Sequence, residues 1–251
     1  MPIIKDLNLL YTNGDSYFAR HKVDARIGYR ADLLKEFEAL LGRKGRVLDV
    51  GCGRGEMLSA ARSSGWDAQG VEPSREFAEF ARQHYGVEVK NCTLQAAEYP
   101  DNHFDAVTLG AVIEHLYYPK QALLEINRIL KPAGLLWADA PNEASLFNLM
   151  GNLYFRILGK DWVTHLFPTF PPYHVQGFTR KSVNLLLRNT GFHLERLRLF
   201  SVRVKFSHGN FREHIEYYGA KAVRKMADLV RMGSYMELIA RKTQSSPEAL
   251  R

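Results

Sequence analysis

Cysteine is scarce in this sequence of 251 residues, which holds only Cys52 and Cys92 and no CxxC pair. A disulfide framework or a zinc site is therefore not expected, and the chain suits a reducing compartment. Long apolar runs are absent too. No stretch approaches the ~20 residues that span a bilayer, and the first residues lack the pattern of a signal peptide. We therefore expect a cytoplasmic protein.

Acidic residues are scarce in the last quarter of the chain. Residues 196–251 hold 12 basic and 5 acidic residues, whereas residues 1–195 hold 22 of each, so the net charge of +7 lies in this last part. A basic excess is typical of a solvated face, or of a surface that meets an acidic substrate, a nucleic acid or an anionic membrane. Residues 196–242 are our candidate for a peripheral contact with an anionic membrane or an acidic substrate, and we do not expect nucleic acid as the partner.

Short apolar runs alternate with amphipathic stretches between residues 31 and 142. The apolar runs predict five strands, at 45–50, 67–73, 87–91, 104–110 and 135–142. The amphipathic stretches predict four helices, at 31–41, 55–65, 74–86 and 119–130. The first helix has an apolar face formed by Leu33, Leu34, Phe37, Leu40 and Leu41. This alternation predicts an α/β fold with a doubly wound, mostly parallel sheet and helices on both faces.

The pattern changes beyond Asn142. Residues 143–178 are rich in leucine and aromatic residues without a clear period, and we interpret them as an inserted helical lid. A helix with Thr179 as its cap follows over 179–191. Alternating apolar and polar residues predict a closing antiparallel strand pair, which brings the sheet to seven strands, at 192–200 and 234–242. A basic amphipathic helical segment lies between these strands, at 210–232.

The stretch VLDVGCGRGEM (47–57) places three glycines, spaced one residue apart, at the end of the first predicted strand. Sheets of this kind bind ligands at the carboxyl ends of their strands. A dinucleotide fingerprint would need a third glycine at the position of Glu56. Asp49 and Glu56 would also repel a pyrophosphate, so the loop suits a cation better than a diphosphate.

A carboxylate at the end of the second predicted strand adds a further condition. Glu72 lies 19 positions after Gly53, and its two oxygens can accept hydrogen bonds from a ribose diol. The expected ligand therefore carries a ribose and positive charge and lacks a pyrophosphate. S-adenosylmethionine meets these three conditions.

Several motifs, in order, closely resemble the class I S-adenosylmethionine-dependent methyltransferases, which have a Rossmann-like fold. The resemblance runs from about Arg46 to Asn142 and includes a later block. Its motifs are VLDVGCGRGEML (47–58), GVEPS (70–74), HFDAVTLGAVIEHLYYP (103–119), ALLEINRILKPAGLLWADAPN (122–142) and GFTRKSVNLLLRNTGF (177–192). The last two blocks are most similar to the subgroup that includes the ubiquinone-biosynthesis O-methyltransferase and many sugar and natural-product methyltransferases. Typical members have Pro-Gly-Gly where this chain has Pro132-Ala133-Gly134.

The resemblance implies S-adenosylmethionine as cofactor and S-adenosylhomocysteine as product. It places Asp49 at the amino group and Glu72 at the ribose hydroxyls. It places the backbone of the loop under the methionine part, at Gly51, Cys52 and Gly53. It places adenine contacts at Pro73, Thr93 and Leu94, and the sulfonium end beside Gly110, Ala111 and Val112. Tyr17 precedes the first helix, in a segment that in relatives often folds over the cofactor, and we interpret Cys52 as a packing residue rather than a nucleophile.

Two histidines are candidate catalytic residues. Glu114-His115 lies where the subgroup carries a Glu-His pair, and His115 is either a general base or a pocket-wall residue that orients the substrate. His174, in PPYHVQGF, matches a histidine common in the subgroup and is either a base or a substrate contact. We expect no metal ligands.

Methyl transfer from a sulfonium is an in-line displacement, for which the protein mainly positions a nucleophile and excludes water. We expect the acceptor to be a small molecule, with a hydroxyl of a sugar, natural product or quinone precursor as the methylated group. The alternatives are a methyltransferase for RNA or another macromolecule, which would use the basic C-terminal quarter, and an inactive cofactor-binding protein. We expect a single methyltransferase domain with four parts: an N-terminal cap and first helix (1–45), a cofactor-binding core (46–142), the lid (143–178) and a C-terminal part (179–251).

Overall fold

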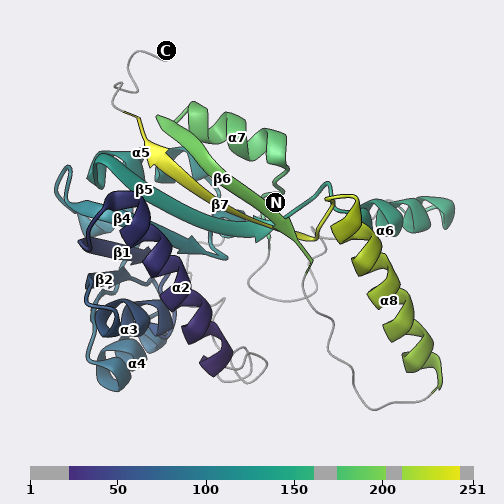
Figure 1. Ribbon diagram of the computed structural model, residues 1–251, viewed down its shortest axis with the longest axis horizontal. Helices are drawn as coiled ribbons and strands as arrows, with labels where there is room; N and C mark the ends of the chain where they lie inside the picture. Colours follow the sequence, from purple (N-terminus) through teal and green to yellow (C-terminus); the bar gives the residue numbers. More distant parts are fainter. Residues whose placement is uncertain (1–22, 161–173, 202–210, 244–251) are drawn as a thin grey trace.

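A seven-stranded sheet forms the centre of the protein, with the strand order β3-β2-β1-β4-β5-β7-β6 (Figure 1). This computed structural model describes residues 23–160, 174–201 and 211–243. Strands β1 to β5 run parallel, whereas β7 runs antiparallel to both of its neighbours. The strands are β1 (Arg46–Val50), β2 (Asp67–Val71), β3 (Glu88–Lys90), β4 (Phe104–Gly110), β5 (Leu130–Pro141), β6 (Phe192–Phe200) and β7 (Tyr235–Lys242). The predicted seven-stranded, doubly wound sheet with its closing strand pair is confirmed.

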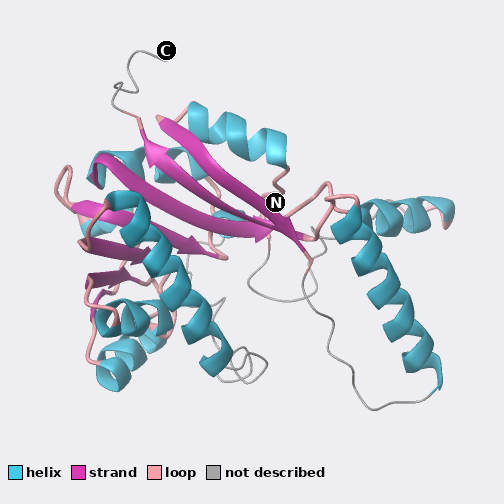
Figure 2. Ribbon diagram, in the orientation of Figure 1, coloured by secondary structure: helices cyan, strands magenta, loops and turns pink. Residues whose placement is uncertain are grey.

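Helices cover both faces of the sheet (Figure 2). One face carries α2 (Val23–Leu41), α3 (Glu56–Ser63) and α4 (Arg75–Tyr85), and the other carries α5 (Pro119–Ile129) and α7 (Arg180–Arg188). Successive strand residues point to opposite faces. In β1, for example, Val47 packs in the core beneath α2 and α3, whereas Leu48 packs in the core beneath α5 and α7. Burial on both sides explains why the central strands appear in the sequence as continuous apolar runs.

Helix α2 begins at Val23, eight residues before the start that the apolar spacing predicts. Of its predicted apolar face, Leu33, Leu34 and Phe37 are buried, and the Phe37 ring packs edge-on to Trp66 of the turn before β2. Leu40, of the same predicted face, is 36% exposed.

Strand β5 also begins earlier than predicted, because Leu130 and the following KPAG segment extend the strand instead of forming a turn. The register of the pairing between β5 and β4 shifts between Phe104 and Ala106, and this shift accommodates the additional segment. Ala133 has a φ of 60°, in the left-handed region that favours glycine. Typical members of the family that the sequence resembles carry glycine at this position.

Two further helices lie apart from the sheet. Helix α6 (Leu146–Ile157) follows β5, and α8 (Phe211–Leu229) precedes β7. Figure 1 shows both on the same side of the molecule, extending away from the strands, and they contact each other. None of the helices in the described part of the chain is both long enough and apolar enough to cross a bilayer.

The strained position in β5 gives a first prediction. Ala133→Gly should raise the free energy of unfolding by roughly 1 kcal/mol, because glycine adopts a positive φ without the steric cost that Cβ imposes. Urea denaturation followed by circular dichroism measures this change. The control is Ala39→Gly, on the exposed face of α2, which should lower stability by about 1 kcal/mol because glycine disfavours a helix. An Ala133→Gly variant less stable than the parent would contradict the assignment of strain.

Candidate functional site

The glycine loop after β1 lies at the carboxyl ends of three neighbouring strands. Asp49 of β1 pairs in register with Gly70 of β2 and with Thr108 of β4. The Gly51 amide then donates a hydrogen bond of 2.8 Å to the carbonyl of Val71, so the loop turns over the end of β2. The site is therefore formed by residues that follow β1, β2 and β4.

Two of the loop glycines are required by close contacts. Gly51 has a φ of 67°, and a Cβ added there would lie 2.7 Å from a methyl carbon of Val112. Gly55 has a φ of 87°, and an added Cβ would lie 2.8 Å from Ala81 in α4. The first contact brings the segment after β4 against the loop. The second lets α3 begin close to α4.

Glu72 joins the ends of β1 and β2. One of its carboxylate oxygens accepts a hydrogen bond of 2.9 Å from the amide of Gly53, and the other accepts one of 2.8 Å from the amide of Ser74. The side chain is buried. Each carboxylate oxygen has a second lone pair, so Glu72 can still accept hydrogen bonds from two hydroxyl groups. This geometry fits a ribose diol.

The loop is surrounded by buried carboxyl groups: Asp49, Glu56 and Glu72 are each at most 5% exposed. Burial raises the pKa of Asp49 to about 6, against the opposing effects of Arg30 and of a 2.6 Å hydrogen bond from the Thr108 hydroxyl. Burial likewise raises the pKa of Glu72 to about 6. A ligand with positive charge would stabilise the ionised forms of both groups, whereas a pyrophosphate would be repelled. This group of buried carboxylates therefore fits a positively charged nucleoside.

The remaining loop and strand-end positions differ in exposure. Cys52 is buried, and burial raises the pKa of its thiol well above the ordinary value, so the thiol stays protonated. Pro73 is partly exposed, and its carbonyl accepts a hydrogen bond from the Asn91 side chain, which ties the end of β3 to the end of β2. Thr93 is exposed and Leu94 is buried, just before the short helix η2 (Gln95–Ala97). Tyr17 lies outside the described residues.

The segment after β4 is held by a residue that the sequence analysis missed. Gly110 and Ala111 are both exposed, and Ala111 has a φ of 53°. Its amide donates a hydrogen bond of 2.6 Å to the carboxylate of Asp139 in β5. Thr108, which holds Asp49, was also missed. Both lie on the sheet face that contains Asp49, and strand alternation could have identified them.

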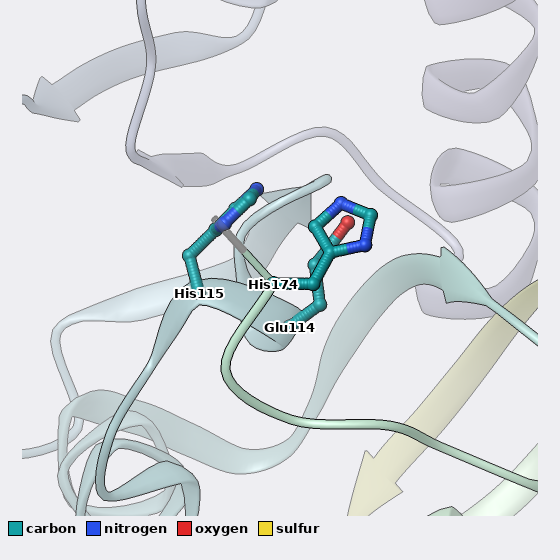
Figure 3. Close-up of side chains that lie close together, drawn as sticks. All are labelled: Glu114, His115 and His174. Carbon is teal, nitrogen blue, oxygen red and sulfur yellow. The ribbon is translucent and has the colours of Figure 1, made fainter. Parts of the chain in front are cut away.

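Beyond Val112, the short helix η3 (Ile113–His115) carries Glu114 and His115, and His174 from the segment before α7 lies beside them in a cluster of titratable side chains (Figure 3). The two imidazole rings lie with their centroids 5.0 Å apart, and one ligand atom from each of the three residues lies within 4.8 Å of the others. The amides of Val175 and Gln176 donate hydrogen bonds to the carbonyl of Glu114, and these bonds fix the chain that carries His174.

Glu114 is the buried member of this cluster and is 1% exposed. One of its carboxylate oxygens has no hydrogen-bond partner among the described residues. Burial, with a smaller contribution from Asp139, raises the pKa of Glu114 to about 8. The side chain can therefore hold a proton near neutral pH, beside two half-buried imidazoles.

This cluster has two possible chemical uses. An imidazole can take a proton from a hydroxyl and exchange it with a neighbouring carboxyl group. Imidazole nitrogens and a carboxylate oxygen are also ligands for divalent transition metals. Both histidines are among the catalytic residues that the sequence predicts, and no metal ligand is expected from it. The Glu114-His115 pair is recognisable in the sequence, whereas its position beside His174 is not.

Comparisons of the sequence with known proteins find methyltransferases. A family model for a methyltransferase domain matches residues 19–197. The chain is 29% identical over 175 residues to the ubiquinone biosynthesis O-methyltransferase of Nitrosococcus oceani, an alignment that covers 65% of this chain and 72% of that protein.

Solved structures share the fold at lower identity. A SAM-dependent methyltransferase from Archaeoglobus fulgidus has a TM-score of 0.61 at 18% identity, over 92% of this chain and 99% of that one. The 1,6-didemethyltoxoflavin-N1-methyltransferase of Burkholderia thailandensis, with S-adenosylhomocysteine bound, has a TM-score of 0.59 at 20% identity, over 97% of this chain and 93% of that one.

The carboxylates of the loop predict pH-dependent binding of S-adenosylhomocysteine. Because the pKa values of Asp49 and Glu72 are both about 6, lowering the pH from about 7.5 to about 5 should protonate them and weaken binding about tenfold or more. Glu72→Gln should weaken binding about tenfold at the higher pH and reduce the pH dependence, since an amide accepts hydrogen bonds less strongly than a carboxylate. Isothermal titration calorimetry measures both effects.

The matched control is Glu76→Gln, an exposed carboxylate in the first turn of α4. The Glu76→Gln variant should bind S-adenosylhomocysteine with the same affinity and the same pH dependence as the parent. If Glu72→Gln also left the affinity unchanged while keeping the parent's thermal stability, the ribose assignment would be wrong.

Proposed function

The chain belongs to the class I S-adenosylmethionine-dependent methyltransferases, and from this premise we propose that it methylates a hydroxyl group of a small molecule. The observation that carries the proposal is the cluster of Glu114, His115 and His174 beside the glycine-loop site. Hydroxyl methylation releases a proton, and this cluster offers two imidazoles that can accept it.

The cofactor side of the site is assigned to the residues around the glycine loop. When bound, S-adenosylmethionine supplies a methyl group on a positively charged sulfur, which is already activated for displacement. Glu72 accepts hydrogen bonds from the ribose, and the carboxylate of Asp49 attracts the amino group. The absence of a side chain at Gly51 allows close approach beside Val112. Pro73, Thr93 and Leu94 belong to the adenine end, and Gly110 and Ala111 to the end where the methyl group is transferred.

The acceptor side is assigned to the two histidines. As the hydroxyl oxygen forms its bond to the methyl carbon, the carbon–sulfur bond breaks and the hydroxyl proton must leave. An imidazole nitrogen of His115 or His174 takes this proton. With a pKa of about 8, Glu114 already holds its proton in most molecules near neutral pH, so the imidazoles are the groups that accept the hydroxyl proton. The 5.0 Å separation of the rings allows one substrate hydroxyl to lie close to both.

The acceptor class follows from the relatives and from the chemistry of the cluster. The curated relative from Nitrosococcus oceani is named for ubiquinone biosynthesis and for O-methylation. A phenolic or catecholic hydroxyl suits a histidine base, because its proton is far more acidic than that of an aliphatic alcohol. We therefore rank a quinone precursor or phenolic natural product first among acceptors, and a sugar second.

The histidine assignment is tested by turnover. His115→Ala and His174→Ala should each lower kcat about 10²-fold or more on whichever acceptor is active among catechols, simple phenols and sugars, while the affinity for S-adenosylhomocysteine stays within about twofold. Transfer of a labelled methyl group measures kcat. His193→Ala, an exposed histidine on β6, is the control and should keep the parent rate. Parent-like rates in both cluster variants would remove the proposed base.

Treatment with a chelator distinguishes a role of these three residues in proton transfer from a role in metal binding. We expect dialysis against EDTA to leave the rate unchanged, because a hydroxyl with a histidine base needs no Lewis acid. Loss of activity on dialysis, restored by adding a divalent cation, would assign the three side chains to a metal ion and contradict the proton-transfer role.

A further inference from the structure

Helix α6 presents its apolar residues outward and a polar residue inward. Asn148 is completely buried, and its amide donates hydrogen bonds to the Asn142 carbonyl and the Glu143 carboxylate, both at 3.3 Å. On the opposite side, large apolar side chains at helical spacing are exposed, up to 75% for Ile157. They are Phe147, Met150, Leu153, Tyr154 and Ile157. A helix that packs on a core has the reverse arrangement, so among the described residues nothing covers this apolar face.

Helix α8 has a second exposed apolar face. Tyr218, Met226 and Leu229 recur at spacings that place them on one side of the helix, and Leu229 is 83% exposed. Ala227, in contrast, is buried. The side of the helix that carries Ala227 is therefore the one that packs inward.

The two faces belong to one projection, which we define as residues 146–160 and 218–231 and name the α6–α8 arm. The helices contact each other, and the Leu146 amide at the start of α6 donates a hydrogen bond of 3.0 Å to the carbonyl of Met232, just beyond α8. The side chain of Asn142 donates to the carbonyl of Gly233 at 2.8 Å, which fixes the base of the arm. Figure 1 shows both helices extending away from the sheet on the same side.

The charge of the arm is strongly positive. It holds six basic residues and one acidic residue, Asp228, whose carboxylate accepts a hydrogen bond of 2.7 Å from Ser201. The ammonium group of Lys221 lies 5.9 Å from the ring centre of Tyr218. Exposed aliphatic and aromatic side chains next to lysine and arginine are the composition of helices that lie in the interface of an anionic bilayer.

We propose that the α6–α8 arm docks on the surface of an anionic phospholipid membrane. The apolar side chains of both helices enter the boundary between headgroups and acyl chains, and the basic side chains contact the lipid phosphates. A second copy of the arm is a poorer partner, because two surfaces with the same positive charge repel each other. A bilayer with negative charge satisfies both the apolar and the basic groups.

Docking would place the acceptor side of the active site near the membrane. The base of the arm adjoins that site, since the Glu143 amide donates to the carbonyl of Phe178, four residues after His174. An acceptor with an acyl or isoprenoid tail could then be methylated while its tail stays in the bilayer. The docking itself does not depend on methyl transfer and goes beyond the proposed function.

The test is co-sedimentation of the full chain with vesicles of phosphatidylcholine alone and with vesicles in which roughly a third of the lipid is phosphatidylglycerol. We expect binding to the anionic vesicles, weak binding to the neutral ones, and a loss of binding as salt is raised. Leu153→Ser with Ile157→Ser should lower the partition coefficient about tenfold or more, because two apolar side chains leave the interface. Lys221→Glu with Lys225→Glu should lower it by a similar factor on anionic vesicles alone.

Matched controls come from α7, on the body of the protein. Leu185→Ser removes a leucine that is 60% exposed, and Arg188→Glu reverses an exposed charge, so neither change touches the arm. Both variants should bind vesicles like the parent, and all variants should keep the affinity for S-adenosylhomocysteine, which shows that they fold. The proposal is overturned if the parent ignores anionic vesicles or if the arm variants bind like the parent. It is also overturned if sedimentation velocity finds a dimer that Leu153→Ser with Ile157→Ser dissociates.

Discussion

The carboxylate of Glu72 is the interaction on which the geometry of the site depends. It accepts one hydrogen bond from the glycine loop after β1 and another from Ser74, the residue that caps α4. The strand ends, the loop and the helix start are thereby held by one buried side chain. The loop can approach Val112 closely because Gly51 carries no Cβ. It can approach Ala81 of α4 closely because Gly55 carries none. A neutral side chain at position 72 would leave the two amides with a weaker acceptor.

The carboxylates of Asp49 and Glu72 lower the stability of the ligand-free protein at neutral pH. The pKa of Asp49 is raised from 3.8 and that of Glu72 from 4.5, both to about 6, so the folded protein binds their protons more tightly than the unfolded chain does. Between roughly pH 4 and 6, the free energy of unfolding of the ligand-free protein therefore falls as the pH rises, by an amount on the order of 2 kcal/mol for each group at neutral pH. A cationic nucleoside offsets this cost when it binds. Stability and cofactor affinity are coupled at this point of the fold.

The sequence predicts the sheet well because each central strand is buried on both faces and each helix between strands has one apolar side. It also identifies the loop, Glu72 and both histidines, since turns and strand ends have local signatures. It does not predict that Thr108 holds Asp49 or that Asp139 holds Ala111, because these contacts join strands that lie about 30 to 60 residues apart along the chain. The start of α2 was missed for a related reason. Its first turns extend beyond the apolar face that signals the helix, and the Tyr29 hydroxyl donates to Glu237 of β7 at the other end of the sequence.

The position of the α6–α8 arm follows from the direction of a single strand. Because β7 runs antiparallel to β5, Pro141 at the end of β5 lies opposite Tyr235 at the start of β7. The segment inserted after β5 and the segment inserted before β7 therefore leave the sheet at the same end of these strands, although 53 residues (158–210) separate α6 from α8 in the sequence. This end of the sheet is formed by the carboxyl ends of the parallel strands, where the glycine loop and the histidines also lie. Aromatic and leucine residues without a clear period suggest a lid with its own core, but α6 buries Asn148 and exposes its leucines. The antiparallel strand thus places two unrelated insertions side by side next to the active site, and both helices carry exposed apolar side chains and basic residues.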